Sequence, residues 1–403
     1  MMDNRNLRYT MFGLLYFAQG AILSYFTALN ALYLLSFGLT MSQVGIFSAI
    51  ALTPFILKIF LGMLSDKVSL LGRGHRKPYI VLGLLIQAGG LFVFPFINPG
   101  IQFELLTAVA FVVMTGMALY DTCTDGLALD TTPPEDEGTV QGIMVGGRAL
   151  GVVVIAAALG LLAQLATWTA AFWALGLVTL LPLILVLQAK EPARSPEQTF
   201  QWKAFRAFGR REVIALAALG ALYSFIINGA NELVNPFLQE QFGIDYFVAG
   251  LYTAVWGLGV IAGGVTGGRL IDRIGHKRAA LGALLLSILA VLALAFIMGA
   301  AMAWPIVFLF GLAFGYYETV YFATSMDLTD PRIAASMFAI LMAAANLGIG
   351  AGFAVSGSLV DAIGYRTTFT IIAGLNLLAL PLIPVIFGRK RGARIGNHRR
   401  AAG

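Results

Sequence analysis

Twelve long apolar runs follow one another along this chain, with only short polar loops between most of them. A helix of about 20 apolar residues is long enough to cross the hydrocarbon core of a membrane. Because 59% of the 403 residues are hydrophobic and only 11% are charged, too few polar groups remain to cover a water-soluble globule. We therefore expect an all-α membrane protein with twelve transmembrane helices, which excludes a soluble domain and a disordered chain. The expected spans cover residues 10–36, 42–64, 78–97, 102–130, 138–164, 167–189, 212–239, 246–271, 279–299, 302–327, 333–360 and 364–387.

Positive charge is concentrated in alternate loops, and this distribution indicates how the chain crosses the membrane. With both termini on the cytoplasmic side, all but three of the 26 Lys and Arg residues lie in inner loops and tails. The exceptions are Arg366 in an outer loop and Lys58 and Arg148 within spans. Cytoplasmic loops of membrane proteins carry such an excess of cations. We therefore predict a plasma- or inner-membrane protein whose net charge of +6 reflects topology and contact with anionic inner-leaflet lipid, not nucleic-acid binding.

The sequence before residue 200 is repeated in weaker form after it. The matching segments are Phe37-Gly38 with Phe242-Gly243, Gly45 with Gly250, Gly62–Val68 with Gly268–Ile274, Gly74–Lys77 with Gly275–Arg278, and Tyr120-Asp121-Thr122 with Tyr317-Glu318-Thr319. They follow the same order and fall at equivalent places in the hydropathy pattern, so we predict two pseudo-symmetric six-helix bundles. The expected parts are an N-terminal bundle (1–189), a cytoplasmic linker (190–211), a C-terminal bundle (212–388) and a basic tail (389–403).

The repeated glycine–acid–cation segments, one after span two and one after span eight, carry a family resemblance. Each begins with Gly62 or Gly268 and continues through Asp66 or Asp272 into a basic tail. They resemble the signature loop of the major facilitator superfamily, and the resemblance to this superfamily covers the whole chain. It implies the fold of that superfamily, in which spans four and five line a central cavity between the bundles. The five-residue insert Ser69–Arg73 departs from the compact loop of the superfamily.

Shorter strings resemble particular branches of the superfamily. Thr53–Lys58 and Asp121–Gly126 are similar to the branch of muropeptide permeases, which are AmpG-like, and acetyl-coenzyme A transporters. Pro133-Pro134-Glu135, followed by Gly142 and Arg148, is similar to the PucC group linked to assembly of bacteriochlorophyll complexes.

The signature loops have a physical interpretation as well. Their acids lie where a helix reaches the cytoplasm, and the cations that follow can bind exposed carbonyls or nearby carboxylates. We expect these loops to latch the two bundles together on the inner side and to release them when they rock. The alternative is that the charges only set topology. The predicted gating residues are Gly62, Asp66, Arg76, Lys77, Gly268, Asp272, Arg273 and Lys277.

Few ionisable side chains lie within the spans, and such residues tend to face a cavity or a partner. Counting along the helices places Lys58, Asp121, Asp125 and Arg148 at similar depths, roughly 15 Å inside the membrane for Asp121 and Arg148 at 1.5 Å per residue. Asp121 and Asp125 share one helix face. Two interpretations stay open: a neutral network that pairs Arg148 with Asp121 and Lys58 with Asp125, or a site where substrate or a proton competes for one of these partners.

The second half differs from the first at these positions. Glu318 occupies the place of Asp121, and Asn346 the place of Arg148, so Glu318 has no cationic partner in its own half. A lone carboxyl in a medium of low dielectric can gain and lose a proton near neutral pH. Glu318 is therefore the best candidate for proton coupling; the alternative is a permanently protonated acid that is hydrogen-bonded to Tyr or Asn.

Polar stripes occur on spans one and seven, where they indicate a wet pathway or hydrogen bonds between helices. Glu232 lies toward the outer third of span seven, where we expect partial solvation, and it is a weaker candidate for coupling. The stripe residues are Gln19, Ser24, Tyr25 and Asn30 on span one and Asn228, Asn231, Glu232 and Asn235 on span seven.

These features predict a monomeric, non-enzymatic transporter that works by alternating access. The sequence contains no ATP-binding G-x-x-x-x-G-K-[ST] segment and no His or Cys spacing typical of a metal site, so we expect no cofactor and no metal. The predicted partners are a small-molecule substrate and a proton, which we expect to bind among Lys58, Asp121, Asp125, Arg148, Glu232, Glu318 and Asn346. A PucC-like assembly or pigment-handling factor and a passive facilitator are the alternatives.

Overall fold

The computed structural model describes residues 5–70, 74–133, 136–189, 191, 209–328 and 334–388. Within them the chain forms helices and turns, and twelve helical segments are long and apolar enough to cross a membrane. The expected all-α fold with twelve spans in two six-helix bundles is confirmed, and the chain is an integral multi-pass membrane protein. Large apolar side chains are exposed around the outside, for example Phe96 (73% exposed) and Leu165 (75%), where lipid rather than water would contact them.

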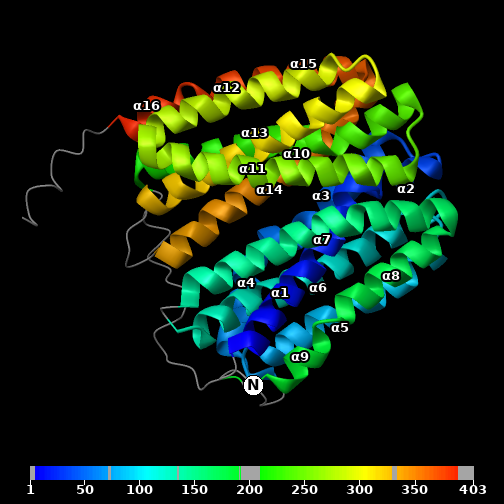
Figure 1. Ribbon diagram of the computed structural model, residues 1–403, viewed down its shortest axis with the longest axis vertical. Helices are drawn as coiled ribbons and strands as arrows, with labels where there is room; N and C mark the ends of the chain where they lie inside the picture. Colours follow the sequence, from blue (N-terminus) through cyan, green and yellow to red (C-terminus); the bar gives the residue numbers. More distant parts are fainter. Residues whose placement is uncertain are drawn as a thin grey trace, which may run out of the picture.

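The first six spans pack together as the N-terminal bundle, which is the lower half of Figure 1. Its helices are α1 (Arg5–Ala28), α2 (Asn30–Ser36), α3 (Met41–Ile56), α4 (Lys58–Lys67), α5 (Lys77–Val93), α6 (Phe103–Thr131), α7 (Glu137–Leu165), α8 (Trp168–Leu180) and α9 (Leu183–Gln188), with a 3₁₀ turn, η2 (Phe94–Phe96), after α5. Span one consists of α1 with α2 as its extension, span two of α3 and α4, and span six of α8 and α9.

The last six spans form the C-terminal bundle, which is the upper half of Figure 1. Its helices are α10 (Arg211–Phe242), α11 (Tyr246–Ile274), α12 (His276–Ala295), α13 (Ala300–Leu328), α14 (Ala334–Ile363), α15 (Tyr365–Leu375) and α16 (Leu382–Phe387), with a 3₁₀ turn, η7 (Asn376–Ala379), after α15. Span twelve is interrupted before α16, where Pro381 precedes its first residue. Proline supplies no N–H to the helical ladder, which favours a break at such a point.

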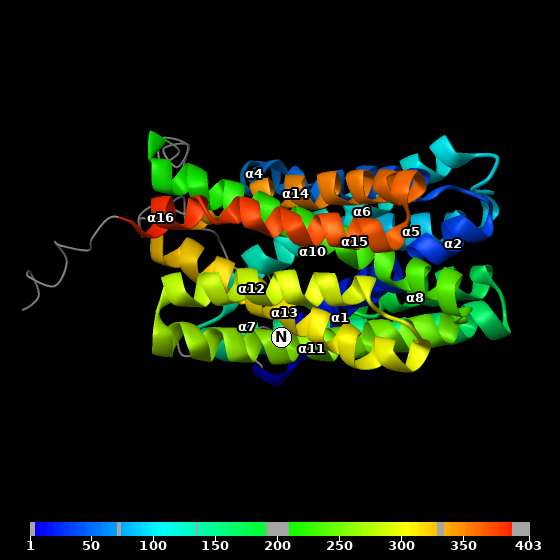
Figure 2. The same ribbon diagram turned by 90° about the horizontal axis from the view of Figure 1, so that it is seen from above.

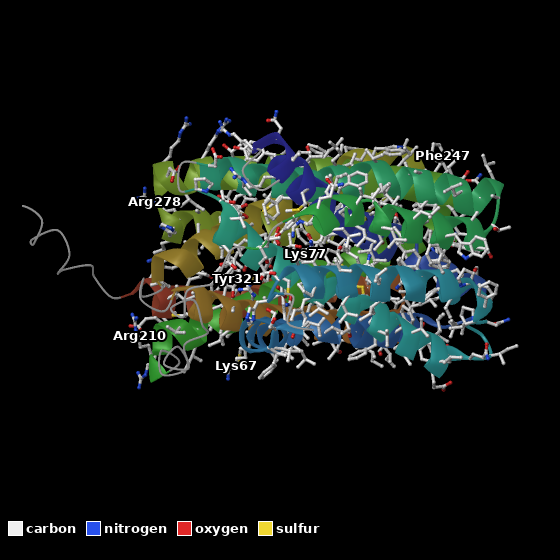
Figure 3. The ribbon with its side chains drawn as sticks, turned by 90° about the horizontal axis from the view of Figure 1, so that it is seen from below. Lys67, Lys77, Arg210, Phe247, Arg278 and Tyr321 are labelled. Carbon is white, nitrogen blue, oxygen red and sulfur yellow. The ribbon has the colours of Figure 1, made fainter. Side chains whose placement is uncertain are left out.

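The helices run between two ends of the molecule. We call the end with α16 the terminal end, and the opposite end, with α2, the far end (Figure 2). Arg210 and Arg278 lie at the terminal end, whereas Phe247 lies at the far end (Figure 3). Arg366, in contrast, lies at the far end, where it donates to carbonyls after α12, 2.7 Å from Ile297 O.

The duplication is visible in the packing. α3 begins after Thr40 and α11 begins after Asp245, two N-cap residues that are 205 positions apart and each accept a backbone N–H of the first turn. Near these starts, each helix lies against the other bundle: a Cβ at Gly45 would lie 2.2 Å from Phe353 O on α14, and one at Gly250 would lie 2.4 Å from Ala156 O on α7. Equivalent glycines thus allow equivalent close contacts between the bundles.

Candidate functional site

A cluster of charged side chains lies on spans two and four, past the middle of each span along the chain. Lys58 is the first residue of α4, directly after a break in the span at Leu57. Its ammonium group donates to the carboxylates of both Asp121 and Asp125, and its Nζ lies 3.3 Å from Asp125 Oδ2. The two aspartates stand one turn apart on α6, so a single cation can bridge them. Hydrogen bonds between ionised partners are stronger than neutral ones, and the three side chains therefore form one network.

Two side chains of α1 complete the hydrogen bonding of these aspartates. Gln19 Nε2 donates to Asp121 Oδ1 at 2.7 Å, and the Tyr16 hydroxyl donates to Asp125. The sequence pattern includes Gln19 in a polar stripe but does not single out Tyr16. Tyr16 lies three residues before Gln19, and residues at this spacing share a helix face. This spacing is the signal by which Tyr16 could have been predicted.

The exposure of the cluster increases from Asp121 to Asp125. The side chain of Asp121 is 4% exposed, that of Lys58 30% and that of Asp125 41%. Asp121 is therefore enclosed by its partners, whereas Asp125 can be reached by a solute or by water. Of the two carboxylates, Asp125 is therefore the more accessible.

Arg148 lies half-buried on α7 and takes no part in this network. In the neutral network considered from the sequence, Arg148 pairs with Asp121; in the structure Lys58 contacts both aspartates instead. Within the described part of the chain, the Arg148 guanidinium makes no hydrogen bond or ion pair.

Glu318 lies half-buried on α13 of the C-terminal bundle. Its carboxyl group makes no hydrogen bond or ion pair with any residue that the structure describes, including the Tyr and Asn partners considered from the sequence. The rings beside it belong to Tyr317 and Tyr223, which stack on each other with centroids 4.1 Å apart. Arg148 and Glu318 are thus a cation and an acid on opposite bundles, and neither has a direct partner among the described residues.

Glu232 is placed differently from the expectation. It is 6% exposed rather than partly solvated, because α10 presents it to the N-terminal bundle. Ser48 Oγ donates to Glu232 Oε1 at 2.7 Å and accepts a hydrogen bond from Asn30 Nδ2 at 2.9 Å. This chain of hydrogen bonds connects the two bundles between the far end and the middle of the spans.

Asn346 also connects the bundles. Its Nδ2 donates to the carbonyl oxygen of Phe55, one residue before the end of α3, at 3.0 Å. Asn346 occupies the position equivalent to Arg148 in the repeat, but it contacts the backbone of the opposite bundle, whereas Arg148 has no such contact.

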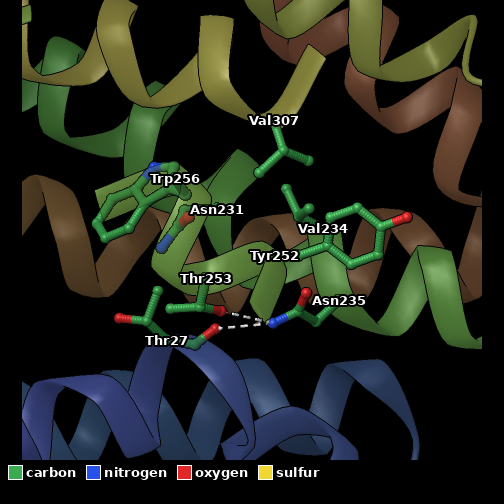
Figure 4. A pocket seen from close by; sticks show the side chains of 8 residues that line it. All are labelled: Thr27, Asn231, Val234, Asn235, Tyr252, Thr253, Trp256 and Val307. Carbon is green, nitrogen blue, oxygen red and sulfur yellow. Dashed lines mark hydrogen bonds between the residues drawn. The ribbon is translucent and has the colours of Figure 1, made fainter. Parts of the chain in front are cut away.

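The polar stripe of span seven borders a small cavity near the far end (Figure 4). Asn235 Nδ2 donates to Ala28 O of the N-terminal bundle and to Thr253 Oγ1, both at 3.0 Å. Asn231 points into the same space toward Trp256. These side chains therefore serve contact between helices, and part of that contact crosses between the bundles.

Hydrogen bonds between the bundles are confined to one half of the described molecule. At the far end, Asp361 accepts from the backbone N–H groups of Met41 (3.1 Å) and Ser42 (2.7 Å). On the equivalent helix pair, Gln164 donates to Asp245 at 3.1 Å. The deepest such bond is that of Asn346 near the middle, and none joins described residues between there and the terminal end. The structure is thus held closed at the far end.

The signature loop of the N-terminal half is assembled within its own bundle. The Arg76 guanidinium is buried, donates to Ser65 Oγ at 2.8 Å and pairs with Asp130 at 3.4 Å. Lys77 Nζ donates to carbonyls at the end of α9, 2.6 Å from Leu187 O. Gly62 packs against Thr122, to which a Cβ would come within 3.2 Å. The side chain of Asp66 lies outside the described residues.

The signature loop of the C-terminal half is more open. Asp272, Arg273 and Lys277 are exposed, and none of them bonds to another described side chain. Gly268 faces Thr319, the equivalent of Thr122, at 4.0 Å for an added Cβ. Neither loop makes a hydrogen bond to the opposite bundle within the described residues.

Comparison with known proteins gives a match over nearly the whole chain. The model of the Major Facilitator Superfamily matches residues 11–338 and 233–402. An anhydromuropeptide permease of Escherichia coli (strain K12) is 27% identical over 364 residues, which cover 85% of this chain and 72% of that protein. The sialic acid transporter NanX of the same strain is 24% identical over 55% of this chain and 53% of its own length. An uncharacterized protein from the puhA-bchM intergenic region of Rhodobacter capsulatus is 25% identical over 66% of this chain and 61% of its own length.

Solved structures show the same fold at low sequence identity. The nucleoside transporter NupG superposes with a TM-score of 0.80 at 16% identity, over 94% of this chain and all of that chain. A bacterial homologue of the human lysosomal transporter Spinster superposes with a TM-score of 0.74 at 18% identity, over 94% of this chain and 97% of that chain.

Proposed function

Because this chain belongs to the Major Facilitator Superfamily, a family with permease relatives, we propose that it is a secondary active transporter that couples the movement of a small anionic solute to protons. One observation carries the proposal: Arg148 and Glu318 lie half-buried on opposite bundles and have no direct partner among the described residues. Lys58, Asp121 and Asp125, in contrast, satisfy one another. A cation and an acid without partners at membrane depth are costly to keep unless a ligand uses them.

Arg148 would bind an acidic group of the solute. Its guanidinium presents several donors in a fixed geometry that suits a carboxylate or phosphate. The names of two relatives support an anion, since muropeptides and sialic acids both carry carboxylates. The proposal extends to this chemical class and does not choose between those two solutes.

Glu318 and Asp125 would carry the protons. Glu318 has no cation to hold it ionised in its own half, and Asp125 is the more exposed of the two aspartates beside Lys58. Asp121 would keep Lys58 in place, together with Gln19. Of the two aspartates, only Asp125 is therefore proposed to exchange protons. Glu232 and Asn346 would serve the contact between bundles, since both bond across it.

Alternating access would bring the site to each side in turn. The cations at the terminal end favour a cytoplasmic location for that end and for both termini, in the plasma or inner membrane of the cell. The far-end closure then corresponds to a state in which the site is reached from the cytoplasm. Residues 190–211 would connect two bundles that rock as units in a monomer, and the two signature loops would close in the opposite state. The basic tail would contact anionic lipid.

Uptake by reconstituted protein tests this proposal. Purified full-length protein in liposomes receives a pH gradient and a labelled anhydromuropeptide or N-acetylneuraminic acid, with uridine as a neutral probe. We expect accumulation of a carboxylate probe that stops when a protonophore is added, and a loss of about 100-fold in Arg148→Ala, since charge-assisted hydrogen bonds contribute about 1.5–3 kcal/mol each. The control Arg278→Ala removes an exposed cation at the terminal end and should transport normally.

Other outcomes would contradict parts of the proposal. Uptake that ignores the protonophore would make the protein a passive facilitator. Uptake of uridine but of neither carboxylate probe would contradict the assignment of Arg148 to an anion.

A PucC-like assembly or pigment-handling role is the second candidate. It is favoured by the likeness to the Rhodobacter capsulatus protein and by the Pro133-Pro134-Glu135 string. Stable co-purification with pigment–protein complexes, together with no uptake of any probe, would support this role over transport.

A further inference from the structure

Span two is divided at Leu57 into two helical segments. α3 ends at Ile56 and α4 begins at Lys58, and the helical hydrogen bonds are long on either side of the break: 3.4 Å from Leu57 N to Thr53 O and 3.3 Å from Leu61 N to Leu57 O. Phe60 N instead bonds to the carbonyl of Leu57, three residues back, at 2.9 Å. A break in a helix needs a local cause, and a proline and a side chain that inserts into the ladder are two of them. Pro54 lies within α3, three residues before the break. Here the side-chain amide of Asn346 also donates a hydrogen bond to the carbonyl oxygen of Phe55.

The first segment, α3, is bound to the opposite bundle. Its start is held by Asp361 through Met41 N and Ser42 N, its middle lies against Phe353 at Gly45, and its end is held by Asn346. α3 also packs more extensively against α14 than against α6 of its own bundle. Three points of attachment along one face make α3 follow α14.

The second segment, α4, is bound to its own bundle. Lys58 is tied to Asp121 and Asp125 on α6, and Gly62 lies against Thr122 on the same helix. α4 packs against α6 more extensively than against α14. The two segments of one span are thus attached to partners that belong to different bundles.

The equivalent span of the second half has no such division. α11 is continuous from Tyr246 to Ile274 and contains no proline. At a shift of 206, Leu57 and Lys58 correspond to Gly263 and Gly264, so the equivalent place also has no charge. The break at Leu57, the cation Lys58 and the amide of Asn346 thus occur together at span two. The described residues of span eight have no such combination.

We propose that Leu57 is a hinge and that Asn346 is a positioning residue, which acts through this hinge on Lys58. In the state closed at the far end, α14 sets the direction of α3 while α6 sets that of α4. When the far end opens, α3 is released from α14 while α4 stays with α6, so the direction of the Lys58 side chain changes relative to Asp125. The contact between bundles and the ion pairs of the site are therefore linked through one bond, that between Asn346 and the carbonyl of Phe55. The use of this link for transport rests on the proposed function; the hinge itself does not.

A distance measurement across the hinge tests the proposal without any substrate. Spin labels at the exposed positions Ile46 on α3 and Leu64 on α4 report the angle between the segments in purified full-length protein. We expect Asn346→Ala to shift or broaden the distance distribution and Asn346→Gln, which keeps the amide donor, to restore it in part. Ser42→Ala is the matched control, because it removes a side-chain donor between the same two helices away from the hinge. A distribution in Asn346→Ala identical to that of Ser42→Ala would overturn the hinge.

A double-mutant cycle tests the link to Lys58. Asn346→Ala and Lys58→Gln are combined and the apparent Tm of each full-length variant is measured in detergent. We expect the decrease in Tm of the double variant to be clearly smaller than the sum of the decreases of the two single variants. The decreases caused by Ser42→Ala and Lys58→Gln should instead add up. Additive losses in the first pair would overturn the role of Asn346 as a positioning residue. Absence of proton-coupled uptake in the wild type, with both results as expected, would contradict the proposed function and leave the hinge in place.

Discussion

The two bundles share their packing and differ in their chemistry. Gly45 and Gly250 allow equivalent contacts with the opposite bundle, and Gly62 and Gly268 face equivalent threonines. At the position of Asp121, however, the second half has Glu318. Asp121 is enclosed by Lys58 and Gln19, whereas Glu318 has no direct partner among the described residues. Positions that set helix contacts have thus kept their residue type in both halves, and positions that face the site have diverged.

The signature loops show the same contrast. In the first half a buried Arg76 joins Ser65 and Asp130, and Lys77 binds the end of α9. In the second half Arg273 and Lys277 are exposed. The first bundle is therefore the more firmly connected at the terminal end. We infer that the first half serves as a rigid frame for Lys58 and that the second half carries the group that changes its charge.

Removal of the cation from the first bundle should give the largest effect. Lys58→Met leaves the buried Asp121 carboxylate unpaired, and loss of one partner of a buried pair costs about 3–5 kcal/mol. Thermal unfolding should show a large drop in stability, and Lys58→Met with Asp121→Asn should recover much of it. Lys67→Met, an exposed cation on the same helix, is the control. A drop no larger than that of the control would contradict the assignment of Lys58 to a buried pair.

The equivalent acids should respond in opposite ways. Glu318→Gln should lower gradient-driven accumulation by about 5–150-fold, the range of a coupling free energy of 1–3 kcal/mol, and leave substrate exchange and stability intact. Asp121→Asn should instead lower the stability, because Lys58 then loses its enclosed partner. Counterflow and concentrative uptake in liposomes separate the two activities. Unchanged accumulation in Glu318→Gln would rule out a coupling role for this residue.

The shared contacts should give equal effects in both halves. A side chain at Gly45 or Gly250 meets a carbonyl oxygen of the other bundle, so Gly45→Val and Gly250→Val should each destabilise the closed far end by about 1–3 kcal/mol. Gly146→Val is the control, since a Cβ there has open space. The opening of the far end is measured by the reaction of a cysteine introduced at the site with a thiol reagent that is added from the far side. If one variant opened this end and the other did not, the packing symmetry would not extend to the motion.

The smallest difference should appear in the loops. Arg76→Gln removes a buried ion pair and a hydrogen bond and should cost about 1–2 kcal/mol of stability. Arg273→Gln, at an exposed site, should change it by less than about 0.5 kcal/mol. Chemical or thermal unfolding of the two variants gives the comparison directly. Equal losses would indicate that the second loop is as firmly attached as the first.

The fold could be predicted from the sequence because its signals are local or periodic. Long apolar runs define the spans, and the repeat relates Gly45 to Gly250 and Asp121 to Glu318 without any structure. Depth along a helix also follows from counting at 1.5 Å per residue, which placed Lys58 and the two aspartates at one level.

The partners within the site could not be predicted in the same way. Which residue Lys58 meets depends on how each helix is rotated and on the break at Leu57, for which Pro54 is a local signal that does not give the exact position. Glu232 was expected to be partly solvated because depth alone does not show which helix covers a face; Ser48 and Asn30 cover it from 184 and 202 positions away in sequence. Contacts between the halves are set by docking, which leaves little trace in either half alone.

The closure at the far end has a consequence for the speed of the cycle. Asp361 holds the first N–H groups of α3, the groups that every helix leaves without an internal acceptor. When Asp361 and α3 separate, water can accept hydrogen bonds from the N–H groups of Met41 and Ser42 in place of the carboxylate. Water can likewise donate to Asp361 in place of these N–H groups. The seal therefore breaks by exchanging one set of hydrogen bonds for another, and no group is stranded in lipid. A seal of this kind can be tight while the far end is closed and can still open quickly.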